Sequence, residues 1–286
     1  MKPWLELLKL RITVASTVTT LVGYVMARGR FDLPLLPVMA GIMLQACGAA
    51  ALNQVQDAVV DARMPRTASR PIPSGRINRG AAFFYALFLL AAGSAVLWTV
   101  SGTAALLGLA AAVVYNGIYT PLKRVTPFAA LPGSFIGALP PVVGWVAAGG
   151  YLSDPTIHQV AFFFFLWQIP HFWLLLLFYE KDYADGGMPS MFDRFDRRQI
   201  VRLTFLWIAA VCVAGLLLPL AALFDHTPAA LLIAAAGLVV VVRAMSLLKV
   251  DTEDLGPFVR SCRIRFMEIN TFALLVSVVL VVDSLV

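Results

Sequence analysis

Long apolar runs alternate with short polar connections along this chain of 286 residues. Each run continues for roughly 20 residues, which is the length of an α-helix that crosses a lipid bilayer. We therefore predict an all-α, polytopic integral membrane protein, with nine transmembrane helices in a single domain over residues 1–286. The predicted spans are 10–27, 34–52, 81–100, 103–119, 128–148, 157–179, 201–223, 228–248 and 267–285.

The composition agrees with this pattern and excludes several classes of protein. Hydrophobic residues make up 60% of the chain and charged residues 13%, whereas a soluble domain is about half apolar and about a quarter charged. A soluble globular enzyme, a disordered chain and a collagen-like chain are therefore excluded. A transmembrane β-barrel is disfavoured, because its strands alternate apolar and polar residues. The three cysteines, Cys47, Cys212 and Cys262, are far apart and predict neither a disulfide framework nor a zinc site.

Positive charge gathers on one side of the predicted topology. If the N-terminus is cytoplasmic, 20 of the 22 Lys and Arg residues lie on the cytoplasmic side, and only Arg28 and Arg30 face outward. Because short cytoplasmic loops carry such an excess, we predict a cytoplasmic N-terminus and a C-terminus outside. The net charge of +6 follows from this topology, and we expect no nucleic-acid partner. Acidic residues meet the ends of the spans on the same side, which predicts an active site there.

The polar segment after the second span carries the first candidate site. Asn53, Asp57 and Asp61 are spaced by four, so a helix places their side chains on one face. Such oxygen ligands suit Mg²⁺, which proteins hold with one or two carboxylates plus substrate phosphates. Arg66 and Arg70 follow, and a planar arginine side chain can bond two phosphate oxygens at once. The pattern predicts a metal–diphosphate site, and the structural alternative is a helix end whose charges pair locally.

Two further segments add charges on the same side. Lys123 and Arg124 lie in the short loop after Tyr119, which ends the fourth span, and they could hold an anionic substrate. An ordinary positively charged cytoplasmic loop is the structural alternative. Asp182 and Asp185 follow the sixth span as a second acidic pair. Two acidic motifs on one membrane face predict two metal ions that bridge one diphosphate.

A histidine, His171, lies within the sixth span directly after Pro170. An ionisable residue inside a membrane segment is a functional candidate. From the residues alone, His171 could ligate haem iron, move a proton or be a hydrogen-bonded residue of the bundle. Aromatic neighbours such as Trp167 and Trp173 form either ordinary packing or a wall for a prenyl chain or an allylic cation. The Gly- and Pro-rich fifth span predicts close helix approach or a broken helix.

Taken together, these segments resemble the UbiA superfamily of intramembrane prenyltransferases, and within it the branch that farnesylates haem. The resemblance covers most of the chain and is strongest over residues 53–191. After Asp182-Tyr183, residues 184–191 depart from the Ala-Gly-Val-Pro-Met stretch of the family. The matching motifs are Asn-x3-Asp-x3-Asp-x2-Met-x-Arg-Thr-x2-Arg-Pro from Asn53 to Pro71, YTPLKRVTP at 119–127, GALPPVVGW at 137–145 and PHFW at 170–173.

The resemblance implies nine helices around a central cavity that opens to lipid, in the cytoplasmic (inner) membrane of a bacterium. It implies a Mg²⁺-dependent enzyme that transfers a farnesyl group from farnesyl diphosphate to a vinyl group of haem B, giving haem O for haem-copper oxidases. The catalytic residues would be Asn53, Asp57, Asp61 and Lys123. The metal ligands would be Asn53, Asp57, Asp61, Asp182 and Asp185, the diphosphate ligands Arg66, Arg70, Tyr119, Lys123 and Arg124, and the haem-binding residue His171.

Three alternatives stay open at this point. A UbiA-type enzyme with an aromatic or quinone-precursor acceptor would keep the acidic motifs but would not need His171. A transporter of an anionic solute would place its charges near the middle of the membrane, whereas here they lie at one face. A non-catalytic assembly factor that holds haem would have no use for two acidic motifs. A handover of the product to a downstream haem-modifying enzyme or oxidase is a further expectation for the partners of this chain.

Overall fold

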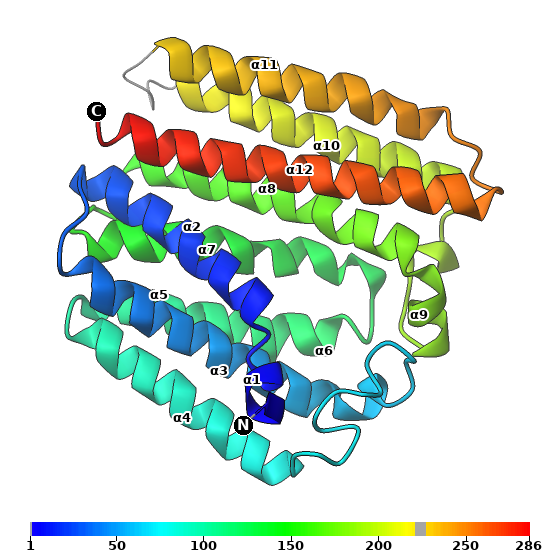
Figure 1. The fold of residues 1–286 in the computed structure, drawn as a ribbon, viewed down its shortest axis with the longest axis horizontal. Coiled ribbons are helices and arrows are strands. Elements are labelled where there is room, and N and C mark those ends of the chain that lie inside the picture. The colour runs from blue at the N-terminus through cyan, green and yellow to red at the C-terminus, as the bar shows by residue number, and fades with distance from the viewer. Residues whose placement is uncertain (1, 221–226) are drawn as a thin grey trace.

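The computed structural model describes residues 2–220 and 227–286, which contain helices and no strand. The predicted all-α membrane fold is confirmed, because nine helical segments of these residues are long and apolar enough to cross a membrane. Figure 1 shows the long helices lying side by side, with the short helix α9 at one end of the bundle. In chain order the elements are α1 (Lys2–Leu7), α2 (Leu10–Arg28), α3 (Leu35–Asp61), α4 (Arg79–Trp98), α5 (Gly102–Val113), the π-helix η1 (Val114–Tyr119), α6 (Thr120–Leu122), the 3₁₀-helix η2 (Pro127–Ala129), α7 (Ala130–Ala147), α8 (Pro155–Phe178), α9 (Glu180–Asp185), the 3₁₀-helix η3 (Met191–Asp193), α10 (Arg197–Leu220), α11 (Thr227–Ala244), the 3₁₀-helix η4 (Met245–Leu248) and α12 (Leu255–Asp283).

Two spans are longer than their apolar runs. Helix α3 continues to Asp61, beyond the predicted end at 52, and α12 begins at Leu255, before the predicted start at 267. Polar residues in both extensions, such as Asp57 and Arg265, are buried against protein. An apolar run marks contact with lipid, whereas a helix continues wherever its backbone hydrogen bonds are satisfied. The predicted end of the seventh span at 223 lies outside the described residues.

Helices α2 and α7 cross closely because each carries a glycine at the crossing. A Cβ atom on Gly144 would lie 1.9 Å from the backbone oxygen of Thr20, and one on Gly23 would lie 1.8 Å from that of Pro141. Small residues let membrane helices approach in this way. The predicted close approach is therefore confirmed, whereas the predicted break is not found, since α7 runs as a continuous helix through Pro140 and Pro141.

We expect Gly144→Ala to lower the free energy of unfolding by about 2–3 kcal/mol, because the added methyl group forces α2 and α7 apart. Thermal unfolding in detergent micelles measures the change. Gly117→Ala is the matched control, since the nearest atom to its new Cβ would be a Val113 methyl carbon at 3.9 Å. Equal melting temperatures for the two variants would contradict the tight crossing.

The fourth span changes from α-helix to π-helix before it ends. In this wider turn Thr120 Oγ1 donates to the backbone oxygen of Tyr115 (2.8 Å), and the backbone oxygen of Asn116 accepts from Gln56 Nε2 on α3 (2.9 Å). A π-turn frees backbone carbonyls for such tertiary contacts and is frequent at functional sites. The sequence pattern did not predict it. The turn ties the end of this span, with Lys123, to α3.

Candidate active site

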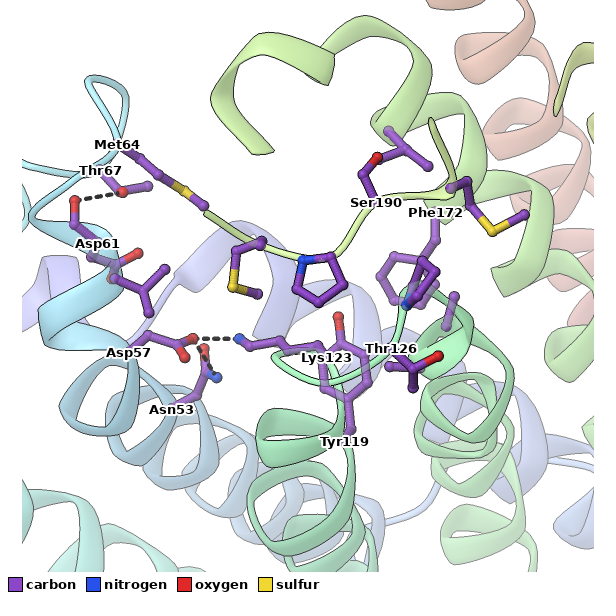
Figure 2. A pocket seen from close by; sticks show the side chains of 18 of the residues that line it. Asn53, Asp57, Asp61, Met64, Thr67, Tyr119, Lys123, Thr126, Phe172 and Ser190 are labelled. Carbon is purple, nitrogen blue, oxygen red and sulfur yellow. Dashed lines mark hydrogen bonds and ion pairs between the residues drawn. The ribbon is translucent and has the colours of Figure 1, made fainter. Parts of the chain in front are cut away.

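A cavity of about 220 Å³ lies at the end of the bundle where α3, the π-helix, α8 and the segment 188–191 meet. Figure 2 shows Asn53, Asp57 and Asp61 on one wall, Phe172 and Ser190 on the opposite wall, and Lys123 reaching across to Asp57. The cavity is therefore polar on the α3 side and largely apolar on the α8 side. Seven of the predicted site residues line it, namely Asn53, Asp57, Asp61, Arg66, Arg70, Tyr119 and Lys123.

Asp57 is the centre of the polar wall. Asn53 Nδ2 donates to its Oδ2 atom at 2.9 Å, and this confirms that the two side chains share one face of α3. The same oxygen accepts from Lys123 Nζ, and Oδ1 accepts from Arg124 Nη2 at 3.1 Å. The Asp57 side chain is buried, so its negative charge depends on these partners. Arg124 contacts Asp57 without lining the cavity.

Asp61, one helical turn further, is held by the connection that follows α3. Both of its carboxylate oxygens accept from Arg70 Nη1, at 2.8 and 2.7 Å. Its backbone oxygen accepts from Thr67 Oγ1 at 2.9 Å. The Asp61 side chain is 6% exposed and that of Arg70 is 28% exposed. This ion pair holds the segment between α3 and α4 against the C-terminal end of α3.

Asp182 and Asp185, the second acidic pair, lie in different surroundings. Asp182 Oδ2 accepts from Arg66 Nε at 3.0 Å, which ties α9 to the segment after α3. The Arg66 guanidinium also lies 4.9 Å from the centre of the Tyr179 ring. Asp185 ends α9 with an exposed side chain. Neither aspartate lines the cavity, and their role as metal ligands stays a prediction.

The oxygen donors of the cavity fit Mg²⁺ when phosphate oxygens complete the ligand set. Over residues 2–220 and 227–286, no three His, Cys, Asp or Glu side chains converge as a metal centre. The α3 wall instead presents Asn53, Asp57 and Asp61. Mg²⁺ is commonly held by one or two carboxylates together with substrate phosphates, which is the combination that this wall and a diphosphate would supply.

Lys9 is a cavity residue that the sequence analysis did not single out. It separates α1 from α2 and is the only described non-glycine residue with a positive φ, 47°. Its Nζ donates to Asn53 Oδ1 at 2.7 Å. Burial, together with the charges of Arg70 and Lys123, lowers the pKa of Lys9 to about 7. Lys9 itself adopts the left-handed backbone conformation that directs its side chain into the cavity. Glycine usually occupies such a position, so nothing in the sequence indicated this turn. Strained backbone of this kind occurs at functional sites.

The charges around the cavity favour an anion. Burial limits how far water can screen them, so an anionic group in the cavity would be attracted to the excess of positive charge. Three cations and two carboxylates line it, which are Arg66, Arg70 and Lys123 against Asp57 and Asp61, and Lys9 adds a further positive charge when it is protonated.

His171 lies beside the cavity, not in its lining. The next two residues on α8, Phe172 and Trp173, line the cavity, while His171 Nδ1 contacts Asn270 Oδ1 on α12 at 3.0 Å. The structure therefore shows a hydrogen bond to a neighbouring helix, and the role of His171 toward haem stays a prediction. Phe172 stacks on Tyr119 with ring centres 6.2 Å apart, so aromatic side chains of α8 do form part of the wall.

Comparisons with known proteins place this geometry in a family context. Residues 16–267 match the UbiA prenyltransferase family. A protein named protoheme IX farnesyltransferase from Oleidesulfovibrio alaskensis is 34% identical over 282 residues, which cover 98% of this chain and 96% of that protein. Another of that name from Nitratidesulfovibrio vulgaris is 37% identical over 240 residues, 84% of each chain. A solved UbiA homologue from Aeropyrum pernix aligns with a TM-score of 0.74 at 19% identity over 96% of this chain and 98% of that chain. One from Archaeoglobus fulgidus, bound to GPP and Mg²⁺, aligns with a TM-score of 0.70 at 15% identity over 95% of this chain and 99% of that chain.

Proposed function

The chain belongs to the UbiA prenyltransferase family, and we propose that it transfers a farnesyl group from farnesyl diphosphate to a vinyl group of haem B. The observation that carries the prenyl-transfer part is the two-sided cavity, whose positively charged wall with oxygen donors faces an apolar aromatic wall. Such a cavity suits a diphosphate joined to an isoprenoid chain. The relatives named protoheme IX farnesyltransferase support the farnesyl donor and the haem acceptor.

In this proposal the diphosphate lies against the α3 wall. Lys123 and Arg70 then stabilise the negative charge that develops on the leaving group. Asn53, Asp57 and Asp61 would hold Mg²⁺, which when bound supplies further positive charge to the diphosphate. Because Lys123 and Arg70 bond carboxylates in the structure, substrate binding would exchange these partners for phosphate oxygens.

The chemistry then proceeds from the allylic carbon of the donor. Its C–O bond to diphosphate breaks and leaves an allylic cation, which the aromatic wall of the cavity stabilises. The terminal vinyl carbon of haem attacks this cation and forms the new C–C bond. This leaves a positive charge on the vinyl carbon attached to the porphyrin ring. A water molecule adds to that carbon and loses a proton, which leaves a hydroxyl group there. Farnesyl diphosphate, haem B and one water are thereby converted to haem O and diphosphate.

A turnover assay tests the proposal directly. Purified protein in detergent is incubated with haem B, farnesyl diphosphate and Mg²⁺, and the extracted haem is examined by mass spectrometry. We expect a product with the mass of hydroxyethylfarnesyl haem, and we expect a chelator to abolish it. Prenyl transfer only to an aromatic acid or a quinone precursor would move the enzyme to another branch of the family. No prenyl transfer to any acceptor would favour a transporter of an anionic solute.

The chain is an integral membrane protein, and we further propose that it lies in the inner membrane of a bacterium with the cavity on the cytoplasmic side. The distribution of Lys and Arg supports this orientation, with the N-terminus inside and the C-terminus outside. Because all three native cysteines are buried, a Lys2→Cys variant carries one exposed reporter. A membrane-impermeant thiol reagent should label it in inverted vesicles and not in intact cells, and the reverse pattern would refute the orientation.

We expect Lys9→Met to raise the KM for farnesyl diphosphate about 10- to 100-fold, because a hydrogen bond to a charged group contributes about 1.5–3 kcal/mol. Steady-state kinetics measures it, with Lys2→Met as the control, since Lys2 is exposed on α1. Lys9→Gly removes the ammonium group but suits the left-handed backbone, so it should lose affinity without losing stability. An unchanged KM in both Lys9 variants would remove Lys9 from the diphosphate site.

A further inference from the structure

A second cavity, of about 370 Å³, lies where the start of α10 meets the connection between η4 and α12. Within the described part of the chain it shares no lining residue with the active-site cavity. Its volume lies within the range of roughly 300–1,000 Å³ that is common for ligand pockets. Its lining carries the cations Arg198, Arg202 and Lys249 and one carboxylate, that of Asp251. The cavity therefore has an excess of positive charge that the proposed prenyl transfer does not use.

The three cations of this second cavity lack partners inside the protein. Over residues 2–220 and 227–286 none of them forms an ion pair or a side-chain hydrogen bond, and all three are exposed. The preceding residue on α10, Arg197, is by contrast paired with Glu180. The Asp251 carboxylate bonds within its own loop, where it accepts from the backbone nitrogen of Glu253 at 3.0 Å. Because like charges that line one cavity repel each other, an anion bound among them would be stabilised.

Apolar side chains continue from this cavity along the outer faces of α10 and α11, which lie side by side at one edge of the bundle (Figure 1). Steps of four residues place Arg198, Arg202 and Leu206 on one face of α10, and Leu206 is exposed. On η4, Met245 and the cavity residue Leu248 are exposed as well. The exposed apolar side chains further along the two helices are Val213, Leu217, Leu231, Leu238 and Val242. Cations at the end of an apolar surface match a lipid in which an anionic head group is joined to acyl chains.

We propose that this cavity binds the head group of an anionic phospholipid, whose acyl chains lie along the exposed apolar faces of α10 and α11. The guanidinium groups of Arg198 and Arg202 would bond the phosphate oxygens, and Lys249 would add a point charge. Basic pockets between transmembrane helices bind anionic head groups in this way. The lipid site is separate from the cavity for prenyl transfer, and lipid binding does not depend on the function proposed above.

The lipid cavity is joined to the active site through Arg197 and α9. Arg197 Nη1 donates to the backbone oxygen of Thr252, which lines the lipid cavity, at 3.4 Å, and its Nε donates to Glu180 Oε2 at 3.0 Å. Glu180 begins α9, which also carries Asp182, and Asp182 pairs with Arg66 at the wall of the active-site cavity. A bound lipid would hold the loop of Thr252 in place and thereby stabilise α9, so we expect it to raise turnover. This link alone rests on the function proposed above.

Native mass spectrometry tests the binding. Purified protein is mixed with equal amounts of phosphatidylglycerol and phosphatidylcholine that have the same acyl chains, and the bound lipids are counted. We expect the unaltered protein to prefer phosphatidylglycerol, and we expect Arg198→Gln/Arg202→Gln to lose this preference by about fivefold for each cation removed. The fold should be kept, since both side chains are exposed. Arg194→Gln/Arg260→Gln is the matched control, because these two arginines are also exposed but do not line the cavity.

Three results would overturn the lipid site. The first is an unaltered protein that binds the two lipids equally. The second is an equal loss of preference in the two double variants, which would indicate a general effect of surface charge. The third is displacement of phosphatidylglycerol by an equal concentration of inorganic phosphate, since the cavity would then select a soluble anion.

Turnover in lipid nanodiscs tests the link to α9. The initial rate of haem O formation should be several-fold higher with phosphatidylglycerol present than in phosphatidylcholine alone, and Arg198→Gln/Arg202→Gln should lose this increase. Arg197→Gln should keep the lipid preference but also lose the increase, because it removes the contacts with Thr252 and Glu180. Phosphatidylglycerol that binds without raising the rate, or an increase that survives in Arg197→Gln, would overturn the link and leave the lipid site standing. No prenyl transfer in either lipid would count against the proposed function and leave the binding result unchanged.

Discussion

We expect the Asp57→Ala variant to lose farnesyl transfer by about 10³-fold in kcat/KM while remaining folded. The Asp57 carboxylate contacts the side chains of Asn53, Lys123 and Arg124. In the proposed mechanism it also supplies an oxygen ligand to the metal. Removal of one preorganised electrostatic group commonly costs about 10²–10³ in rate, and loss of metal-ion charge stabilisation adds to it.

The fold should survive the change because the two cations left behind can reach water. The side chain of Lys123 is 20% exposed and that of Arg124 is 39% exposed. The initial rate of haem O formation and the melting temperature are measured on the same preparation. Glu253→Ala, which removes an exposed carboxylate far along the chain, is the control and should keep full activity. Activity retained in Asp57→Ala would remove Asp57 from the metal site.

Arg70→Met should produce the largest loss of stability among these variants, about 3–5 kcal/mol. The substitution leaves the buried carboxylate of Asp61 without its partner, and breaking a buried pair from one side costs about this much. The double variant Asp61→Asn/Arg70→Met should recover most of the loss, because no buried charge remains unpaired. It should not recover activity, since both residues belong to the proposed diphosphate and metal site.

A double-mutant cycle isolates the interaction energy between Arg70 and Asp61 from the effects that each substitution has on its other contacts. The free energies of unfolding of both single variants, the double variant and the unaltered protein are compared in detergent micelles. Arg76→Met is the control for loss of an arginine from the same connection, since its pair with Glu6 is exposed and exposed pairs contribute about 0–1 kcal/mol. If Arg70→Met and the double variant lose the same free energy of unfolding, the unpaired Asp61 carboxylate is not the cause of the loss.

The sequence by itself determined the helices and one wall of the cavity. Contact with lipid requires long uninterrupted apolar runs, so hydropathy located all nine spans. The shared face of Asn53 and Asp57 followed from the spacing of four, because helical periodicity is a local property. Composition could not show that α3 and α12 extend past their apolar runs, since the polar side chains there are buried by protein and not by lipid.

Only the tertiary structure decided which groups meet. Lys123 and Asp57 are 66 residues apart, Arg66 and Asp182 are 116 apart, and His171 and Asn270 are 99 apart. A charge pattern along the chain shows that cations and carboxylates lie on one side of the membrane, but their pairing depends on how the helices pack. The left-handed turn at Lys9 and the π-turn before Lys123 depend on that packing too. Such strained or widened turns persist only where contacts with distant elements hold them, and no local residue signals them.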